Sequence, residues 1–95
     1  MTASPVNEDP DALGAVQVLL QQGEVAKALE ALNGLADTAQ SSAMGQYMRG
    51  VCLRLTRDFA NAESVLRQLV DSNPSYGRGF QELGHLYRDA NMPIE

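Results

Sequence analysis

The sequence contains few residues of several kinds, and each scarcity excludes a class of structure. Cys52 is the only cysteine, so no disulfide can form within the chain and no thiolate cluster can hold a metal ion. No apolar run reaches the ~18 residues that a membrane-spanning helix needs. The polar, acidic N-terminus also lacks the apolar stretch of a signal peptide. These features predict a cytoplasmic protein in which Cys52 is a buried, inert residue on a helix.

Basic residues are also scarce, and one type dominates them. Seven Lys or Arg residues stand against twelve Asp or Glu, which gives a formal net charge of −5. Binding to nucleic acid is therefore not expected, because non-specific binding depends on a surplus of positive charge. Lys27 is the only lysine, so almost all of the positive charge belongs to arginine. The planar guanidinium group is suited to bidentate contacts with carboxylate, phosphate or sulfate.

An internal repeat is the clearest positive feature of the chain. Residues 23–35 align with residues 57–69 at an offset of 34 residues, without a gap. A period of this length is typical of solenoids, in which each unit buries its apolar face only against its neighbours. A short solenoid favours a function in holding a partner over a function in catalysis. The coinciding small and apolar residues are Ala26, Ala28, Leu32 and Leu35 in the first segment and Ala60, Ala62, Leu66 and Leu69 in the second.

Helix signals predict an all-α chain of five antiparallel helices joined by short turns, with no strand. After a disordered lead at 1–8, Asp9-Pro10-Asp11 supplies an N-cap, a first-turn proline and a first-turn acid. Residues 37–40 are expected to form a turn, and Ser41 or Ser42 is expected to cap the helix that follows. The expected helices span 10–22, 24–36, about 42–55, 59–71 and 76–90.

The signature of the repeat is most complete in the segment 80–87, which reads aromatic-x-x-Leu-Gly-x-x-Tyr. Ala62, Leu66 and Leu69 have the matching spacing on the preceding expected helix, and Pro74 closes the unit after it. With these residues the chain resembles the tetratricopeptide repeat family, whose unit has 34 residues. The resemblance implies a right-handed α-solenoid of antiparallel helix pairs. Its domain would span 9–95, with about two and a half units at 9–42, 43–76 and, in part, 77–95.

Four positions depart from the pattern of that family. Ala12 and Val16 occupy places of the aromatic residue and the glycine, while Gln46 and Arg49 occupy places of an aromatic residue and a leucine. The third unit ends before its second helix. This implies that the chain is a fragment of a longer protein or that its last helix serves as a cap. Marginal stability, or self-association through that helix, is expected.

The resemblance also implies a concave groove lined by the first helix of each unit. Arg54 and Arg88 are one repeat apart, so they are expected to project in parallel and to make the groove locally positive. The groove is predicted to bind a protein or peptide with acidic and apolar residues. The alternative interpretation is a set of solvated side chains on an exposed helix face. The predicted groove residues are Leu13, Gln17, Leu20, Met44, Tyr47, Val51, Arg54, Arg78, Gln81, His85 and Arg88.

One known activity of the family is not expected in this chain. Members that bind chaperone tails use a clamp of lysine, asparagine and arginine at set places in the groove. Only Arg78 is compatible with that clamp. The corresponding positions hold Leu13, Gln17, Met48, Arg78 and Glu82.

No catalytic constellation can be identified, so the chain is predicted to be non-catalytic, with no cofactor and no metal. Glu82, His85 and Asp89 share one helix, but they lack a fourth ligand and have Arg88 beside them. Two further functions stay open. Residues 73–89 resemble repeats that precede sulfotransferase domains in some bacterial proteins, which implies an N-terminal accessory region of a larger enzyme. The other is a homo-oligomerisation module that uses the uncovered last helix.

Overall fold

The protein is described by a computed structural model, in which residues 12–91 are placed. All regular structure in this range is helical, and it contains no strand. The expected disordered lead, the helix start at Asp9-Pro10-Asp11 and the last four residues lie outside the described range. The helices are α1 (Ala12–Gln21), α2 (Val25–Asn33), α3 (Asp37–Ser41), α4 (Ala43–Leu55), α5 (Phe59–Ser72) and α6 (Gly77–Asp89).

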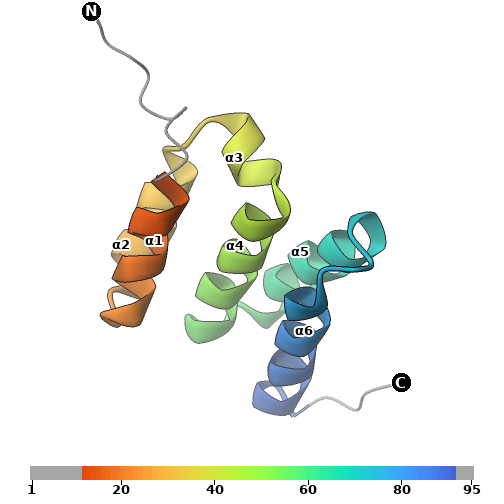
Figure 1. Cartoon of the computed structure of the whole chain (residues 1–95). Helices are drawn as coiled ribbons and strands as arrows, with labels where there is room; N and C mark the ends of the chain where they lie inside the picture. Colours follow the sequence, from red (N-terminus) through yellow and green to blue (C-terminus); the bar gives the residue numbers. More distant parts are fainter. Residues whose placement is uncertain (1–11, 92–95) are drawn as a thin grey trace, which may run out of the picture.

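The helices pack in a repeat-like order along the chain. α1 and α2 lie side by side, and α4 packs against both of them. α5 then returns along α4, and α6 packs against both α4 and α5 (Figure 1). The first helix of each new pair therefore rests on both helices of the pair before it. α4 contacts each of the other five helices.

Two pairs of core positions that are 34 residues apart are equally buried, as the sequence repeat predicts. Ala28 and Ala62 are both fully buried, and so are Leu32 and Leu66. The buried residues form two clusters. The first consists of Val16, Ala28, Leu32, Met48 and Cys52, and the second of Ala62, Leu66, Leu69, Val70, Leu83, Leu86 and Tyr87.

The two clusters meet at α4. Met48 and Cys52 of α4 belong to the first cluster, while Leu53 of the same helix packs against the second. Tyr47 packs against both. Burial of apolar side chains against adjacent helices is the main source of stability in such a fold, because each helix alone is too short to be stable in water.

Within residues 12–91 the structure has six helices, whereas the sequence predicted five. The expected turn at 37–40 is part of the short helix α3, and α2 ends at Asn33, three residues before the predicted end. Gly34 follows as the C-cap, in the right-handed helical region at φ −86° and ψ −4°. Gln40 of α3 then donates from Nε2 to the carbonyl oxygens of Leu35, at 2.7 Å, and of Asn33, at 3.1 Å. The interruption is stable because these carbonyl groups keep a partner.

The start of α4 agrees with the sequence prediction. Ser42 is its N-cap, and the Ser42 hydroxyl accepts a hydrogen bond from the Gly45 backbone N–H at 3.0 Å. The same hydroxyl donates to the Ala39 carbonyl oxygen at 2.6 Å. Ser42 therefore joins the end of α3 to the first turn of α4.

Candidate functional site

A hollow of about 210 Å³ lies across α1, α4 and α6. Its walls are mostly apolar, and one basic residue, Arg78 of α6, stands at its edge. Six of the predicted groove residues line it: Gln17, Leu20, Met44, Tyr47, Val51 and Arg78. Gln21 and Met48 complete the lining. Gln21 was not predicted in the groove, and Met48 was named only at a position of the chaperone-tail clamp.

Helical spacing explains why α4 supplies the floor of this hollow. Met44, Tyr47, Met48 and Val51 stand at i, i+3, i+4 and i+7, which places them on one face of the helix. Met48 is almost fully buried, whereas the other three are half-buried. The floor is therefore anchored in the first core cluster and still offers apolar surface to a ligand.

Arg78 is held at the mouth of the hollow by an aromatic contact. Its guanidinium carbon lies 5.6 Å from the centre of the Tyr47 ring, within range of a cation–π interaction. Tyr76 packs edge-on against the same ring, at 6.1 Å between ring centres. Burial raises the pKa of Tyr47, so its hydroxyl is neutral at physiological pH. Within residues 12–91, no carboxylate lies within 4.0 Å of Arg78.

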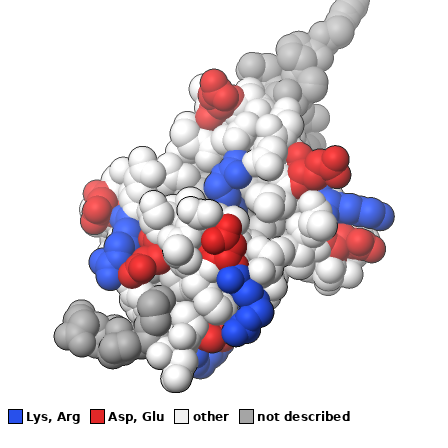
Figure 2. Space-filling model, turned by 180° about the vertical axis from the view of Figure 1, so that it is seen from behind, with Lys and Arg blue, Asp and Glu red and all other residues white. Residues whose placement is uncertain are grey.

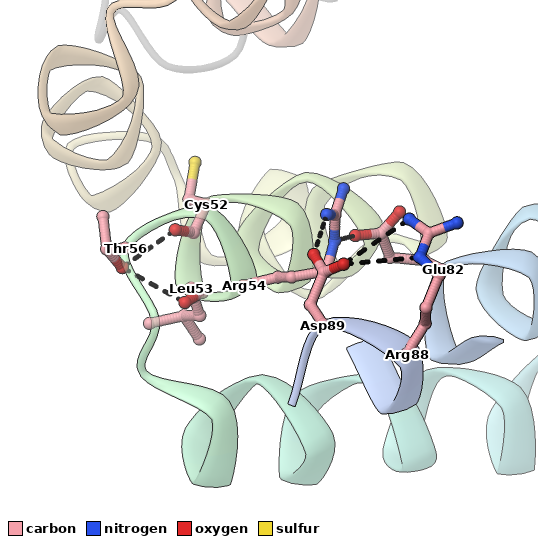
Figure 3. Close-up of polar contacts among 7 residues, drawn as sticks. All are labelled: Cys52, Leu53, Arg54, Thr56, Glu82, Arg88 and Asp89. Atoms are coloured by element: carbon pink, nitrogen blue, oxygen red, sulfur yellow. Dashed lines mark hydrogen bonds and ion pairs between the residues drawn. The ribbon is translucent and has the colours of Figure 1, made fainter. Parts of the chain in front are cut away.

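Arg54 lies outside this hollow and forms an ion-pair cluster between α4 and α6 (Figure 3). It donates from Nε to Glu82 and from Nη1 to Asp89, the latter at 2.6 Å. The Arg54 side chain is 15% exposed and that of Glu82 only 4%. Burial alone would lower the pKa of Arg54, but the hydrogen bonds to the two acids outweigh it and the pKa is raised.

Arg54 and Arg88, which were predicted to project in parallel, do not both present a free positive charge. Arg88 is 67% exposed and meets Asp89 only at 3.5 Å, while Arg54 is engaged by two acids. Glu82 and Asp89, which lie on the same helix as Arg88, face α4 and reach Arg54 there. The sequence places these acids on α6, but their reach to Arg54 depends on how the helices pack.

The remaining predicted groove residues lie apart from the hollow. Leu13 packs against the first core cluster. Gln81 is exposed and His85 is half-buried, and both belong to α6. The candidate ligands Glu82, His85 and Asp89 on α6 do not form a metal site, because Arg54 pairs with both of the carboxylates. Among the described residues, no group of three or more His, Cys, Asp or Glu side chains could hold a metal ion.

Comparisons with models of protein families, with curated proteins and with solved structures found no significant match to this chain. The part of the chain that the structure describes has no helix long and apolar enough to cross a membrane.

Proposed function

We propose that this chain is a non-catalytic protein-interaction module that holds a peptide segment of a partner in the hollow across α1, α4 and α6. The observation that favours it is the combination of an apolar floor with Arg78, which stacks on Tyr47 at the mouth and meets no described carboxylate. Such a combination suits one apolar side chain of a partner with an acidic residue beside it.

The size of the hollow favours a side-chain anchor over a small metabolite. Pockets for drug-sized ligands enclose about 300–1,000 Å³, whereas this hollow encloses about 210 Å³. Tyr47 and Arg78 belong to residue types that are enriched among interface hot spots, and methionine, present here as Met44 and Met48, is enriched at interfaces in general. A buried anchor and a paired charge would together give a weak, reversible complex.

The tetratricopeptide resemblance supports the same proposal. The structure has a repeat-like order of helices, and the hollow is lined by the helices that correspond to the first helix of each unit. We propose that the helix pairs belong to a right-handed solenoid of that family. The accessory region of a sulfotransferase-like enzyme is a narrower version of this proposal, since it would use the same surface; it depends on the resemblance of residues 73–89 alone.

Selection from a displayed peptide library on the intact chain tests the proposal. The expected outcome is enrichment of peptides with a large apolar residue next to Asp or Glu. Met44→Glu and Arg78→Glu should each weaken capture of these peptides at least tenfold. Val18→Glu and Arg88→Glu are the matched controls, because Val18 is 48% exposed outside the hollow and Arg88 is 67% exposed. Capture that survives both substitutions in the hollow would contradict the proposal.

A second function, self-association through α6, is favoured by one observation. Phe80 is 52% exposed, and a Cβ added at Gly84 on the same helix would have no neighbour within 4 Å. An apolar aromatic residue next to an open glycine leaves surface on which another helix can lie. Light scattering over a range of concentrations tests it. Self-association should be lost in Phe80→Ser, and a monomer at all concentrations would rule this function out.

A further inference from the structure

A second hollow, of about 470 Å³, lies between α3, α4 and α5. Gln46 and Arg49 of α4 line it, whereas residues 44, 47, 48 and 51 of the same helix line the first hollow, across α1, α4 and α6. At about 100° of helix rotation per residue, these two sets lie on opposite sides of α4. Gln46 and Arg49 are two of the residues that depart from the tetratricopeptide pattern. The full lining is Asp37, Gln40, Ser41, Gln46, Arg49, Val65 and Gln68.

Arg49 is fixed in place at this hollow by two side chains. Its Nη1 donates to Asn33 Oδ1 at 2.5 Å, and its Nη2 donates to Gln40 Oε1 at 2.6 Å. Gln40 is itself held by its hydrogen bonds to the interrupted end of α2. The guanidinium group has therefore already lost much of its rotational freedom before any ligand arrives, which reduces the cost of binding.

The positive charge of Arg49 is not compensated by the residues around it. Both of its acceptors are neutral amides, and no described carboxylate lies within 4.0 Å. A guanidinium group has five N–H donors, so about three of them are still unused. Figure 2 shows that basic and acidic patches are interspersed with uncharged surface on one face of the molecule.

The polar residues of the hollow satisfy one another only in part. Gln46 donates from Nε2 to the Ser41 carbonyl oxygen at 3.2 Å, but its Oε1 atom is buried and accepts no hydrogen bond from the described residues. Gln68 lies exposed on the α5 wall and can offer its amide N–H groups to a ligand. Arg49 thus supplies a fixed cation and Gln68 additional donors, a combination that favours an anionic acceptor, whereas the Gln46 Oε1 atom is itself an acceptor and does not contribute to it.

We propose that this second hollow binds a carboxylate side chain, Asp or Glu, of a partner polypeptide, with Arg49 as the group that receives it. Asp37 is exposed and also lines the hollow, so a doubly charged phosphate would meet more repulsion than a carboxylate. Arg49 and a carboxylate can form two parallel N–H···O bonds, which fixes the orientation of the partner. This site is spatially separate from the first hollow, because it lies on the other side of α4.

Titration of the intact chain with sodium acetate at constant ionic strength, followed by NMR, tests this site. The Nε–Hε signal of Arg49 should move along a saturating curve with a dissociation constant on the order of tens of millimolar, as expected for one charge-assisted contact. The signal of Arg57, an exposed arginine outside both hollows, should move less and without saturation. Equal, linear shifts of all arginine signals would overturn the proposal. Saturation of the Arg49 signal at a lower concentration of inorganic phosphate than of acetate would also overturn the proposal.

Gln68→Glu provides the decisive variant, because it adds a carboxylate to the wall of the hollow and leaves the contacts of Arg49 with Asn33 and Gln40 in place. It should reduce the acetate shift at Arg49 at least threefold. Gln81→Glu is the matched control, since Gln81 is an exposed glutamine on α6, outside this hollow, and should leave the shift unchanged. A capped tripeptide Gly-Asp-Gly should reproduce the acetate result, and Gly-Asn-Gly should not. An unchanged shift in Gln68→Glu, or equal shifts with the two peptides, would also overturn it.

Discussion

Gly50 of α4 lies so close to Leu66 of α5 that a Cβ atom at Gly50 would be 2.6 Å from Leu66 Cγ. Leu66 is fully buried in the second core cluster, so it has no free space into which to move. Gly84 stands one repeat later on α6, and a Cβ there would have no neighbour within 4 Å. The same residue type therefore has a packing requirement at one position of the repeat and none at the next.

Alanine substitution at these two glycines should change stability in opposite directions. Gly50→Ala should destabilise the fold by about 1–3 kcal/mol, because it overpacks the contact with Leu66. Gly84→Ala should stabilise it by about 0.5–1 kcal/mol, because alanine costs less conformational entropy in a helix. Urea unfolding followed by circular dichroism measures both. Equal effects of the two substitutions would show that the close contact of α4 with α5 does not determine the choice of glycine.

Removal of Arg54 should cost more stability than removal of any exposed arginine. Arg54→Met leaves the buried Glu82 carboxylate without its partner, which is expected to cost about 3–5 kcal/mol. Arg54→Met combined with Glu82→Met should recover part of that loss, because no unpaired charge is then buried. Arg88→Met is the control and should stay within about 0.5 kcal/mol of the parent protein. A double-mutant cycle from urea unfolding measures the coupling, and strict additivity would contradict it.

Two carboxyl groups should make the fold sensitive to acid. The hydrogen bond from Arg54 lowers the pKa of Asp89 below its usual 3.8, and hydrogen bonds from Tyr87 and then Arg67 lower the pKa of Glu63 below 4.5. A lowered folded-state pKa adds stability above the unfolded-state value, and that stability is lost as the pH falls through the folded-state pKa.

The acid sensitivity can be measured from the free energy of unfolding between neutral pH and pH 2. Asp89→Asn and Glu63→Gln should each be less stable than the parent protein at neutral pH. Each difference should shrink as the pH falls below the usual pKa of the carboxyl group that was removed. A difference that does not change with pH would assign the effect to packing and not to charge.

Cys52 should be unreactive in the folded protein. Its side chain is fully buried, and burial raises the pKa of its thiol from 9.0 to about 11. A disulfide reagent should therefore modify it at neutral pH only as fast as the chain opens, and at once in urea. A raised thiol pKa gives stability that is present below pH 9.0 and is lost as the pH rises toward about 11. Rapid modification of the folded protein would contradict the burial.

The repeat offset predicted part of the core, and four of its residues show why. Ala28, Leu32, Ala62 and Leu66 are buried because small and large apolar residues at helical spacing have only one way to be removed from water. Six of the eight residues that line the first hollow were predicted, and Met44, Tyr47 and Val51 among them share one face of α4. These features depend on periodicity within a helix, and periodicity is visible in a sequence.

The features that the sequence could not predict depend on contacts between helices. The break after Asn33 is stabilised by the side chain of Gln40, seven residues further along the chain. The partners of Arg54 are 28 and 35 residues away, and they engage it only because α6 packs against α4. Side-chain reach across an interface is set by the packing of two helices, which no local pattern in the sequence specifies.

Because α4 lies between the two core clusters, local opening of one cluster is expected to affect the other. Both core clusters include or touch residues of α4, and the groove and the second hollow lie on opposite sides of the same helix. Amide hydrogen exchange in α4 should therefore be the slowest in the chain, since its opening requires both clusters to separate. A ligand in either hollow would slow exchange in the α1–α2 pair and in the α5–α6 pair together. One helix thus makes two small cores behave as one cooperative unit.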